Sequence, residues 1–312
     1  MITYTEIGRN KAYSVLLIFI FLLVIIGLGF FAAQIYNAPG LVLLAVVFST
    51  ISAFVSYFYS DKITLAISGA QEINLQTHQD LYRIVENLSI AGGLPMPKVY
   101  TIDDSAINAF ATGRNPQHAV VCVTTGALSR LDKTELEGVL AHELSHVGNY
   151  DIRFMTLVVV LVGIITLLAD WMLRISFFGG GRRSRDNNDG GQILMIVGIV
   201  LVILSPIVAM LIQLAVSRKR EYLADASGAL LTRYPEGLAS ALEKIAADKE
   251  PLEAANKATA HLYIANPFKD DEADSSDNPD GAKKSNAGWF SSLFNTHPPI
   301  EERIKRLREM GH

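Results

Sequence analysis

Residues 141–146 read Ala-His-Glu-Leu-Ser-His, and this stretch lies inside a segment whose pattern predicts an α-helix. Because an α-helix turns once in about 3.6 residues, His142 and His146 project from the same face. Two imidazoles one turn apart can bind a single zinc ion at about 2.0–2.1 Å. Glu143 lies beside such an ion without ligating it, where it can take a proton from a zinc-bound water and pass it to a leaving amine. The stretch therefore predicts a metal-binding helix with catalytic chemistry.

A second segment supplies what the histidine motif lacks. In a chain with seven histidines, the motif arises by chance in on the order of one chain in a hundred, and a helix with two satisfied surface histidines carries the same pattern. Catalytic zinc needs three protein ligands and one open position. Residues 220–225, Arg-Glu-Tyr-Leu-Ala-Asp, offer Glu221 as the third ligand, with Asp225 one turn later. Asp225 could accept a hydrogen bond from a ligand histidine and fix its tautomer. Alone, such an acidic pair more often marks a solvated helix face.

The composition points to a membrane protein. Of the 312 residues, 50% are apolar and 19% are charged, and the mean hydropathy is +0.29. This is too apolar for an ordinary soluble protein. The net charge of −4 argues against a nucleic-acid partner. The single cysteine, Cys122, allows no internal disulfide, and its apolar neighbours predict a buried strand residue rather than a nucleophile.

Four apolar runs are long enough, or nearly so, to cross a bilayer as helices. They cover residues 13–33, 41–59, 154–173 and 193–216. A turn without charge joins the first two, so residues 1–62 are predicted to form an N-terminal transmembrane hairpin; a cleaved signal peptide would have a shorter apolar core. The last two, within residues 153–217, are weaker because they carry Asp170, Pro206 and Gln213. They predict a second hairpin that either spans or re-enters the membrane.

The two remaining segments, 63–152 and 218–312, are predicted to form the first and second parts of one catalytic domain. The first part should contain an amphipathic helix over 76–89, strands over 98–102 and 119–124, and a helix that starts near Asp132. Glu135, three residues after Asp132, completes a capping-box pattern there. The second part is mostly helical by pattern, with a polar segment over 269–286 that is predicted to be disordered. The fold class is therefore α-rich α+β within a multi-pass membrane protein.

The order of these segments explains how the two halves of the site meet. The histidine motif ends just before the third apolar run, and Glu221 follows just after the fourth. A pair of antiparallel helices returns the chain to the side it left, whether the pair spans or re-enters the membrane. The metal site is therefore predicted to lie at the membrane surface.

Charges near the apolar runs predict the orientation. The side that would hold both termini and the site carries Arg9, Lys11, Lys62, Arg218, Lys219 and Arg220, and the first short loop carries no positive charge. The positive-inside rule then places the site in the cytoplasm. The loop after the third run conflicts with this assignment, because four arginines would lie outside: Arg174, Arg182, Arg183 and Arg185. Full spanning of the last two runs therefore stays open.

Five separated motifs together resemble the HtpX family of membrane-bound zinc endopeptidases. They are the Asp-Lys-Thr-Glu-Leu start at 132–136, the His-Glu-Leu-Ser-His core, the segment 220–225, Asn-Ala-Phe-Ala at 108–111 and Thr-His-Pro-Pro at 296–299. The likeness covers nearly the whole chain, including the order of the four apolar runs. Motifs in this number and order are far more specific than any one of them.

The resemblance implies a zincin-like (gluzincin) catalytic domain that holds one Zn²⁺ per chain. It carries over His142, His146 and Glu221 as ligands and Glu143 as the catalytic base. It further implies cleavage of membrane or misfolded proteins, as part of quality control at the plasma (inner) membrane. The sequence does not determine the oligomeric state, natural substrates or cleavage preference.

Two further residues are weaker candidates. Asn108 could lie on a strand bordering the cleft, where an extended substrate could pair, or it could be a plain strand-end residue. His297 could stabilise the tetrahedral oxyanion, or it could be a loop histidine before a helix. For the whole chain, two alternatives stay open: a membrane scaffold or chaperone with a structural or vestigial metal site, and a hydrolase of non-peptide bonds.

Overall fold

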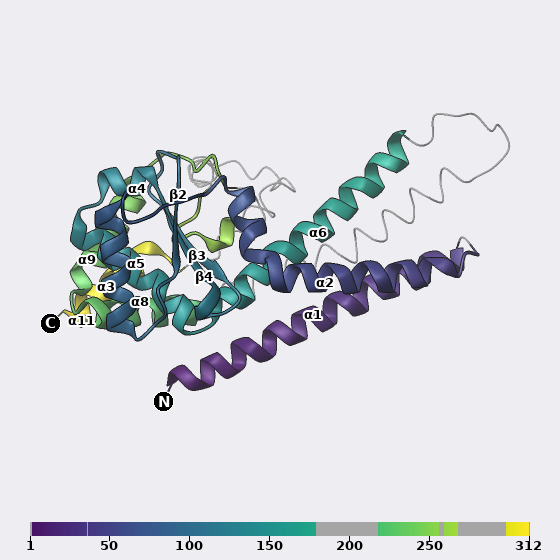
Figure 1. Ribbon diagram of the computed structural model, residues 1–312, viewed down its shortest axis with the longest axis horizontal. Helices are drawn as coiled ribbons and strands as arrows, with labels where there is room; N and C mark the ends of the chain where they lie inside the picture. The colour runs from purple at the N-terminus through teal and green to yellow at the C-terminus, as the bar shows by residue number, and fades with distance from the viewer. Residues whose placement is uncertain (1, 36, 179–217, 256–258, 268–297, 312) are drawn as a thin grey trace, which may run out of the picture.

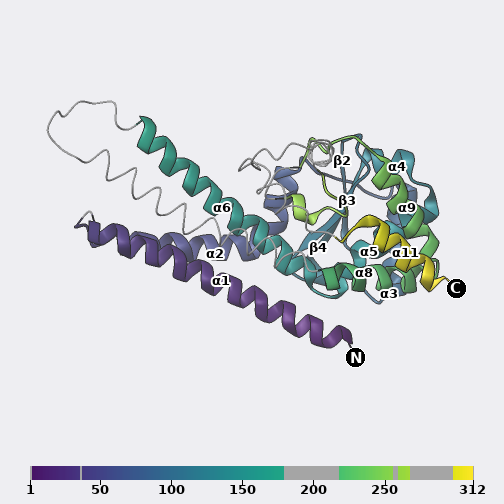
Figure 2. The same cartoon turned by 180° about the vertical axis from the view of Figure 1, so that it is seen from behind.

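The computed structural model describes residues 2–35, 37–178, 218–255, 259–267 and 298–311. Figure 1 shows a rounded unit around a small sheet, with helices α1, α2 and α6 extending from it as an arm. The rounded unit contains the segments predicted to form the catalytic domain and is called the catalytic unit. The reverse view in Figure 2 shows the same separation, with the C-terminus on the catalytic unit at the end remote from the arm. The fourth predicted apolar run, the polar segment over 269–286 and His297 lie outside the described residues.

The arm begins with two helices that can cross a membrane. Helix α1 covers Ile2–Ile35 and α2 covers Gly40–Ile67. Their candidate spans, Ile7–Gln34 and Gly40–Ile67, are each 28 residues long, with mean hydropathies of 3.2 and 2.2. Large apolar side chains are exposed on their outer faces, among them Phe19, Leu23, Leu44, Ile51 and Phe54. Such a surface suits lipid rather than water.

Small residues bring the helices of the arm together. The buried face of α2 includes Ala45, Ser49, Ala53, Ser56 and Ser60, spaced by three or four residues. Gly29 of α1 lies opposite this face, and a Cβ on it would lie 2.2 Å from the Cβ of Ala45. Small residues allow this close approach of helices within a membrane. Larger side chains of α1 pack against α6, in a cluster that includes Leu17, Phe21, Phe154, Leu157 and Leu161.

The sheet has four strands in the order β1-β2-β4-β3. They are β1 (Gln71–Glu72), β2 (Lys98–Ile102), β3 (Ala109–Gly113) and β4 (Ala119–Thr124). Strands β2 and β4 are parallel, with Val99 opposite Val121, and β3 is antiparallel to β4, with Phe110 opposite Cys122. The bounds of β2 and β4 match the two strands predicted from their β-branched runs. The segment between them, which holds the Asn-Ala-Phe-Ala motif, forms β3 at the edge of the sheet.

Both faces of the sheet are buried. Val121 and Val123 of β4 face a core shared with α3 (Gln79–Gly92), α5 (Lys133–Gly148), α9 (Pro235–Ala247) and α11 (Ile300–Met310). Cys122 faces the other core, which includes residues from the end of α2 and the start of α6. Burial raises the pKa of the Cys122 thiol, which confirms the prediction of a buried strand residue and argues against a nucleophile.

Helix α5 carries the histidine motif and starts as predicted. Asp132 is its N-cap and accepts hydrogen bonds from the backbone of Thr134 and Glu135, while Glu135 bonds back to the backbone of Asp132. The chain then bends by 84° between α5 and α6 (Asp151–Phe178). Tyr150 sits at the bend with a φ of 61°, a left-handed conformation that disfavours a bulky side chain. The bend directs α6, which contains the third predicted apolar run, into the arm (Figure 1).

Candidate metal centre

The site forms where α8 (Arg218–Thr232) packs against α5. Gly228 of α8 lies against the backbone of His142, and a Cβ at Gly228 would lie 3.0 Å from the backbone nitrogen of His142. The two helices therefore approach too closely for most side chains at this position. Glu221 and Asp225 lie on the same helix as Gly228, so this contact sets their distance from the histidines.

Three candidate metal ligands converge at the α5–α8 contact. One donor atom from each of His142, His146 and Glu221 lies within 4.8 Å of the other two, and all three residues are buried. The Nε2 atoms of the two histidines are 3.2 Å apart. Glu221 places Oε2 at 3.7 Å from Nε2 of His142 and Oε1 at 3.6 Å from Nε2 of His146. The two sequence segments predicted to share a site are thus brought together.

A carboxylate behind each histidine fixes its orientation. Nδ1 of His142 lies 2.9 Å from Oδ1 of Asp225, as expected from the sequence. Nδ1 of His146 lies 3.0 Å from Oδ2 of Asp151, which the sequence did not suggest. A carboxylate oxygen accepts a hydrogen bond, so Nδ1 of each histidine donates to the carboxylate behind it and Nε2 faces the centre, where its lone pair can bind an ion.

This donor set fits a zinc ion. Two imidazole lone pairs that face each other repel unless a cation or proton lies between them. A tetrahedral ion with bonds of about 2.0–2.1 Å would hold two nitrogens about 3.3 Å apart, close to the 3.2 Å observed. Two imidazoles and one carboxylate are a known catalytic zinc set, and they leave a fourth position open.

Glu143 lies next to this centre, and the pKa of its carboxyl group is raised. Its side chain is buried, and burial raises its pKa to about 7, although the nearby His146 and a hydrogen bond from the backbone of Ala111 act in the opposite direction. A carboxylate with a pKa near neutral can both accept and return a proton, as general acid–base catalysis requires. Ala111 belongs to β3, so the edge strand and Glu143 meet directly.

The surroundings shift the pKa values of the two histidines in opposite directions. Burial lowers the pKa of His142 below its usual range, even though Asp225 favours the charged form. Burial also disfavours the charged form of His146, but the hydrogen bond with Asp151 and the charge of Glu221 outweigh it and raise its pKa to about 9. In the absence of an ion, a proton on His146 would separate the two Nε2 atoms.

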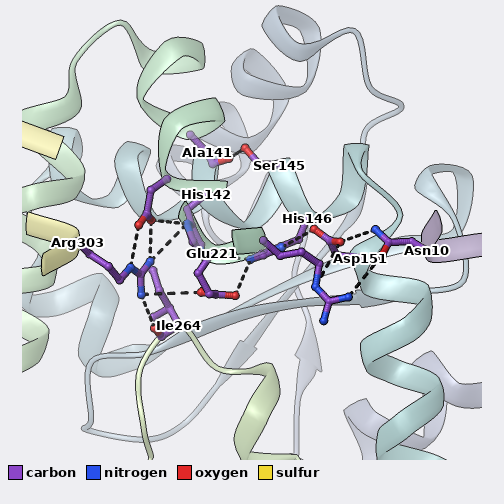
Figure 3. A network of polar contacts seen from close by, with 11 residues as sticks. Asn10, Ala141, His142, Ser145, His146, Asp151, Glu221, Ile264 and Arg303 are labelled. Atoms are coloured by element: carbon purple, nitrogen blue, oxygen red, sulfur yellow. Dashed lines mark hydrogen bonds and ion pairs between the residues drawn. The ribbon is translucent and has the colours of Figure 1, made fainter. Parts of the chain in front are cut away.

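Arg303 of α11 is a further buried member of the site (Figure 3). Its guanidinium is fully buried and donates two hydrogen bonds to Asp225, with Nε at 2.9 Å and Nη2 at 2.8 Å. Nη1 donates to the carbonyl of Ile264 at 3.1 Å and lies 4.0 Å from Glu221. Burial raises the pKa of Asp225, but Arg303 and His142 outweigh it and lower that pKa to about 2. Arg303 therefore keeps Asp225 ionised behind the candidate ligand His142.

A second polar group extends from His146 into the arm, as Figure 3 shows. The amide of Asn10, on α1, donates to Oδ1 of Asp151 and, at 3.0 Å, to the carbonyl of Asn149. Nη1 of Arg220, which precedes the candidate ligand Glu221, lies 3.5 Å from Oδ1 of Asn10. The side chains of Asn10, Asp151 and Arg220 are all buried.

The weaker candidates have different outcomes. Asn108 directly precedes β3 and is buried, and its amide donates to the carbonyl of Ala265 at 3.4 Å. The carbonyl of Ala109 accepts from the backbone of Ile264 at 3.1 Å. The chain itself thus occupies this start of the strand edge, and a substrate role for Asn108 stays a prediction. His297 lies outside the described residues, so its role stays a prediction as well.

Comparisons with known proteins agree with this geometry. A model of peptidase family M48 matches residues 75–311. Proteins named "Protease HtpX homolog" are 45% identical over 309 residues in Tropheryma whipplei, covering 99% of both chains, and 45% identical over 307 residues in Thermoanaerobacter pseudethanolicus, covering 97% of this chain and 96% of that one. The crystal structure of S. mikatae Ste24p matches with a TM-score of 0.50 at 18% identity, over 98% of this chain and 66% of that one. The last match shows a shared fold.

Together the apolar helices, the peptidase match and the buried donor set define a membrane metalloprotease. The sequence identity extends over nearly the full length, arm included. The chain belongs to peptidase family M48 and, within it, to the HtpX family. The family resemblance found in the sequence is thereby confirmed.

Proposed function

We propose that this chain is a zinc endopeptidase that cleaves membrane or misfolded proteins at the cytoplasmic membrane surface, in membrane protein quality control. The observation that carries the proposal is the convergence of His142, His146 and Glu221 beside Glu143, at the base of the membrane arm. Nε2 of each histidine and the carboxylate of Glu221 would hold the ion. When bound, zinc supplies a Lewis acid that polarises a peptide carbonyl and increases the acidity of water.

The side chains around the ion have separate tasks. Glu143, buried beside the proposed ion, accepts a proton from the attacking water and returns it to the nitrogen of the leaving amine. Asp225 and Asp151 hold the ligand histidines in the tautomer that presents Nε2. Arg303 holds Asp225 ionised and in place.

The position of the site supports protein substrates at a membrane. Asp151, behind His146, is the first residue of α6, the helix that packs with α1 and α2 in the arm. A segment of a membrane protein that leaves the bilayer would meet the catalytic unit at this level. The edge strand β3 lies on the site through Ala111 and Glu143, where an extended chain could add its own hydrogen bonds once the start of the strand is accessible.

Two variants separate metal binding from catalysis. Purified full-length Glu143→Gln should retain one zinc per chain and lose cleavage of an unfolded protein, because it keeps the ligands and loses the base. Glu221→Ala should lose zinc and cleavage together. Glu137→Gln is a matched control, since Glu137 is on the same helix, is 35% exposed and pairs only loosely with Lys133 at 4.0 Å.

The outcomes discriminate between the proposed functions. Proteolysis that persists in Glu143→Gln would remove the base from the mechanism. If Glu221→Ala retained zinc, Glu221 could not be the third ligand. A parent protein that binds zinc but cleaves neither unfolded protein nor itself would favour the scaffold or chaperone alternative.

The cytoplasmic orientation has its own test. Cys122 is the only cysteine and is completely buried, so an introduced cysteine is the sole reactive thiol. A membrane-impermeant maleimide should label Lys133→Cys in inverted vesicles but not in intact cells, because Lys133 is on the catalytic unit and its side chain is 76% exposed. Gln34→Cys, at the remote end of α1, should show the reverse pattern. Labelling of Lys133→Cys in intact cells would place the site outside.

A further inference from the structure

Asn10 is a buried polar residue near the start of the N-terminal membrane helix α1. It lies within the apolar span Ile7–Gln34 and has no exposed surface. An amide in such a place costs free energy unless its hydrogen bonds are satisfied. Asn10 lies between Arg9 and Lys11, at the end of the span near the catalytic unit, and the partners of its buried amide indicate what it does.

The partners of Asn10 come from three segments that build the metal site. The side-chain amide nitrogen of Asn10 donates to the carbonyl of Asn149, just after α5, at 3.0 Å. The same amide nitrogen also donates to Oδ1 of Asp151, the first residue of α6. The amide oxygen faces Nη1 of Arg220 at 3.5 Å, and Nε of Arg220 lies 3.9 Å from the same Oδ1 of Asp151.

This arrangement divides the two oxygens of Asp151. Oδ1 is held by Asn10 and faces Arg220, which leaves Oδ2 for Nδ1 of His146 at 3.0 Å. The carboxylate has little freedom to rotate, because a rotation would break the bonds at both oxygens. His146 is therefore oriented by a residue of the N-terminal membrane helix, through one carboxylate.

We propose that Asn10 is a positioning residue for the metal centre, through which the N-terminal membrane helix sets the zinc affinity of the site. Asn10 acts on His146 through Asp151. It also contacts Arg220, the residue directly before the proposed ligand Glu221. This inference rests on the proposed zinc site. It adds that α1 contributes to the site as well as anchoring the chain.

The test is a double-mutant cycle on zinc affinity. Full-length variants in detergent, all in a Glu143→Gln background to prevent self-cleavage, are titrated with zinc against a chromophoric chelator. Loss of a residue that orients a ligand weakens metal binding roughly 10–100-fold, which we expect for Asp151→Ala. Asn10→Ala acts one bond further away and should weaken binding about tenfold or less. In the Asp151→Ala background, Asn10→Ala should have little further effect, because its target is gone.

A control and a second variant keep the test decisive. Ser14→Ala removes a buried hydroxyl one turn further along α1, which donates to the carbonyl of Asn10 at 2.8 Å and has no other hydrogen bond among the described residues. It should leave zinc affinity unchanged. Asn10→Leu removes the amide while suiting a membrane helix, and it should weaken zinc binding as Asn10→Ala does.

Each outcome decides a separate question. Folded Asn10→Ala or Asn10→Leu with parental zinc affinity but a lower melting temperature would make Asn10 a packing residue and overturn the inference alone. Equal losses from Asn10→Ala with and without Asp151 would also overturn it, because Asn10 would not act through that carboxylate. Failure of both Asn10 variants to fold, while Ser14→Ala folds, would assign a structural role instead. A parent without zinc would overturn the proposed function and this inference together.

Discussion

Replacing Arg303 tests whether the site depends on a buried ion pair. In Arg303→Gln the carboxylate of Asp225 loses two hydrogen bonds, of 2.9 and 2.8 Å, and the carbonyl of Ile264 loses one of 3.1 Å. Arg303 has no exposed surface and Asp225 is 3% exposed, so water cannot replace these bonds. Glu221, 4.0 Å from Arg303, loses a compensating charge as well.

The expected magnitude follows from the burial. Hydrogen bonds to charged groups contribute about 1.5–3 kcal/mol each, but they are not independent, and removal of one partner from a buried pair costs about 3–5 kcal/mol in total. For a domain of 150–250 residues, 1 kcal/mol shifts the melting temperature by about 2–4 °C. We therefore expect the zinc-free Arg303→Gln protein to melt roughly 10 °C below the parent.

Three companion variants identify the cause. Arg306→Gln, on the same helix, should change little, because Arg306 and its partner Glu302 are 48% and 44% exposed. Arg303→Lys keeps the charge but not the planar fork, so it should recover only part of the stability. Arg303→Met with Asp225→Leu should be more stable than Arg303→Met alone, since the Asp225 carboxylate is then no longer left buried without its partner.

The assay is thermal unfolding of zinc-free, full-length protein in detergent, followed by circular dichroism. The absence of metal removes self-cleavage and any stabilisation by the ion. Equal melting temperatures for Arg303→Gln and Arg306→Gln would refute the reasoning. Full recovery by Arg303→Lys would show that a point charge suffices and that the bidentate geometry carries no free energy.

Three other predictions follow from close contacts and capping. Gly228→Ala should lower zinc affinity and stability, because its Cβ would lie 3.0 Å from the backbone nitrogen of His142 and such overpacking costs about 1–3 kcal/mol. Metal titration and thermal melting measure the two effects, and parental values in both would mean that α8 can shift freely. Gly29→Leu should separate α1 from α2 at Ala45, where a Cβ would lie only 2.2 Å away, and a more protease-sensitive arm is the expected readout. Asp132→Ala should destabilise α5 by about 1 kcal/mol at neutral pH. Hydrogen bonds from the backbone of Glu135 and from Thr134 lower the pKa of Asp132, so this stabilisation is present above the ordinary aspartate pKa of about 4 and is lost as pH falls through the lowered value; Asp132→Asn should retain a cap independent of pH, and a parental pH profile in that variant would contradict the assignment.

Local pattern was sufficient where the interaction is local. The capping box at Asp132 and Glu135 involves residues three apart, and the motif His142-Glu143-Leu144-Ser145-His146 places both ligands within one turn of a helix. Strands β2 and β4 follow from β-branched runs that are buried along most of their length. In each of these cases, the physical cause lies within a few residues of sequence.

The partners missed from sequence depend on tertiary geometry. Asp151 follows His146 by five residues, a spacing that puts two side chains on different sides of a continuous helix. The chain bends by 84° between them, with Tyr150 in a left-handed conformation, and this turns the Asp151 carboxylate toward Nδ1 of His146. Arg303 lies in the run Glu-Glu-Arg-Ile-Lys-Arg, which as sequence resembles a solvated helix face. Only the docking of α11 distinguishes Arg303, with no exposed surface, from the exposed Arg306.

The bend also connects the metal site to the membrane arm. A straight continuation of α5 would carry the third apolar run past the catalytic unit and leave His146 without its carboxylate. The bend instead starts α6 beside α1, and this contact permits Asn10 to bond Asp151. The left-handed backbone of Tyr150 costs roughly 1–3 kcal/mol of folding free energy, which the surrounding contacts must offset. Two cations contact its ring: the Lys11 ammonium lies 4.3 Å from the ring centroid, and the Arg153 guanidinium lies 5.5 Å from it. Lys11 belongs to α1, so docking of the membrane helix stabilises the same bend that orients His146, a candidate ligand. We therefore expect that conditions which loosen the arm weaken zinc binding before they unfold the catalytic unit.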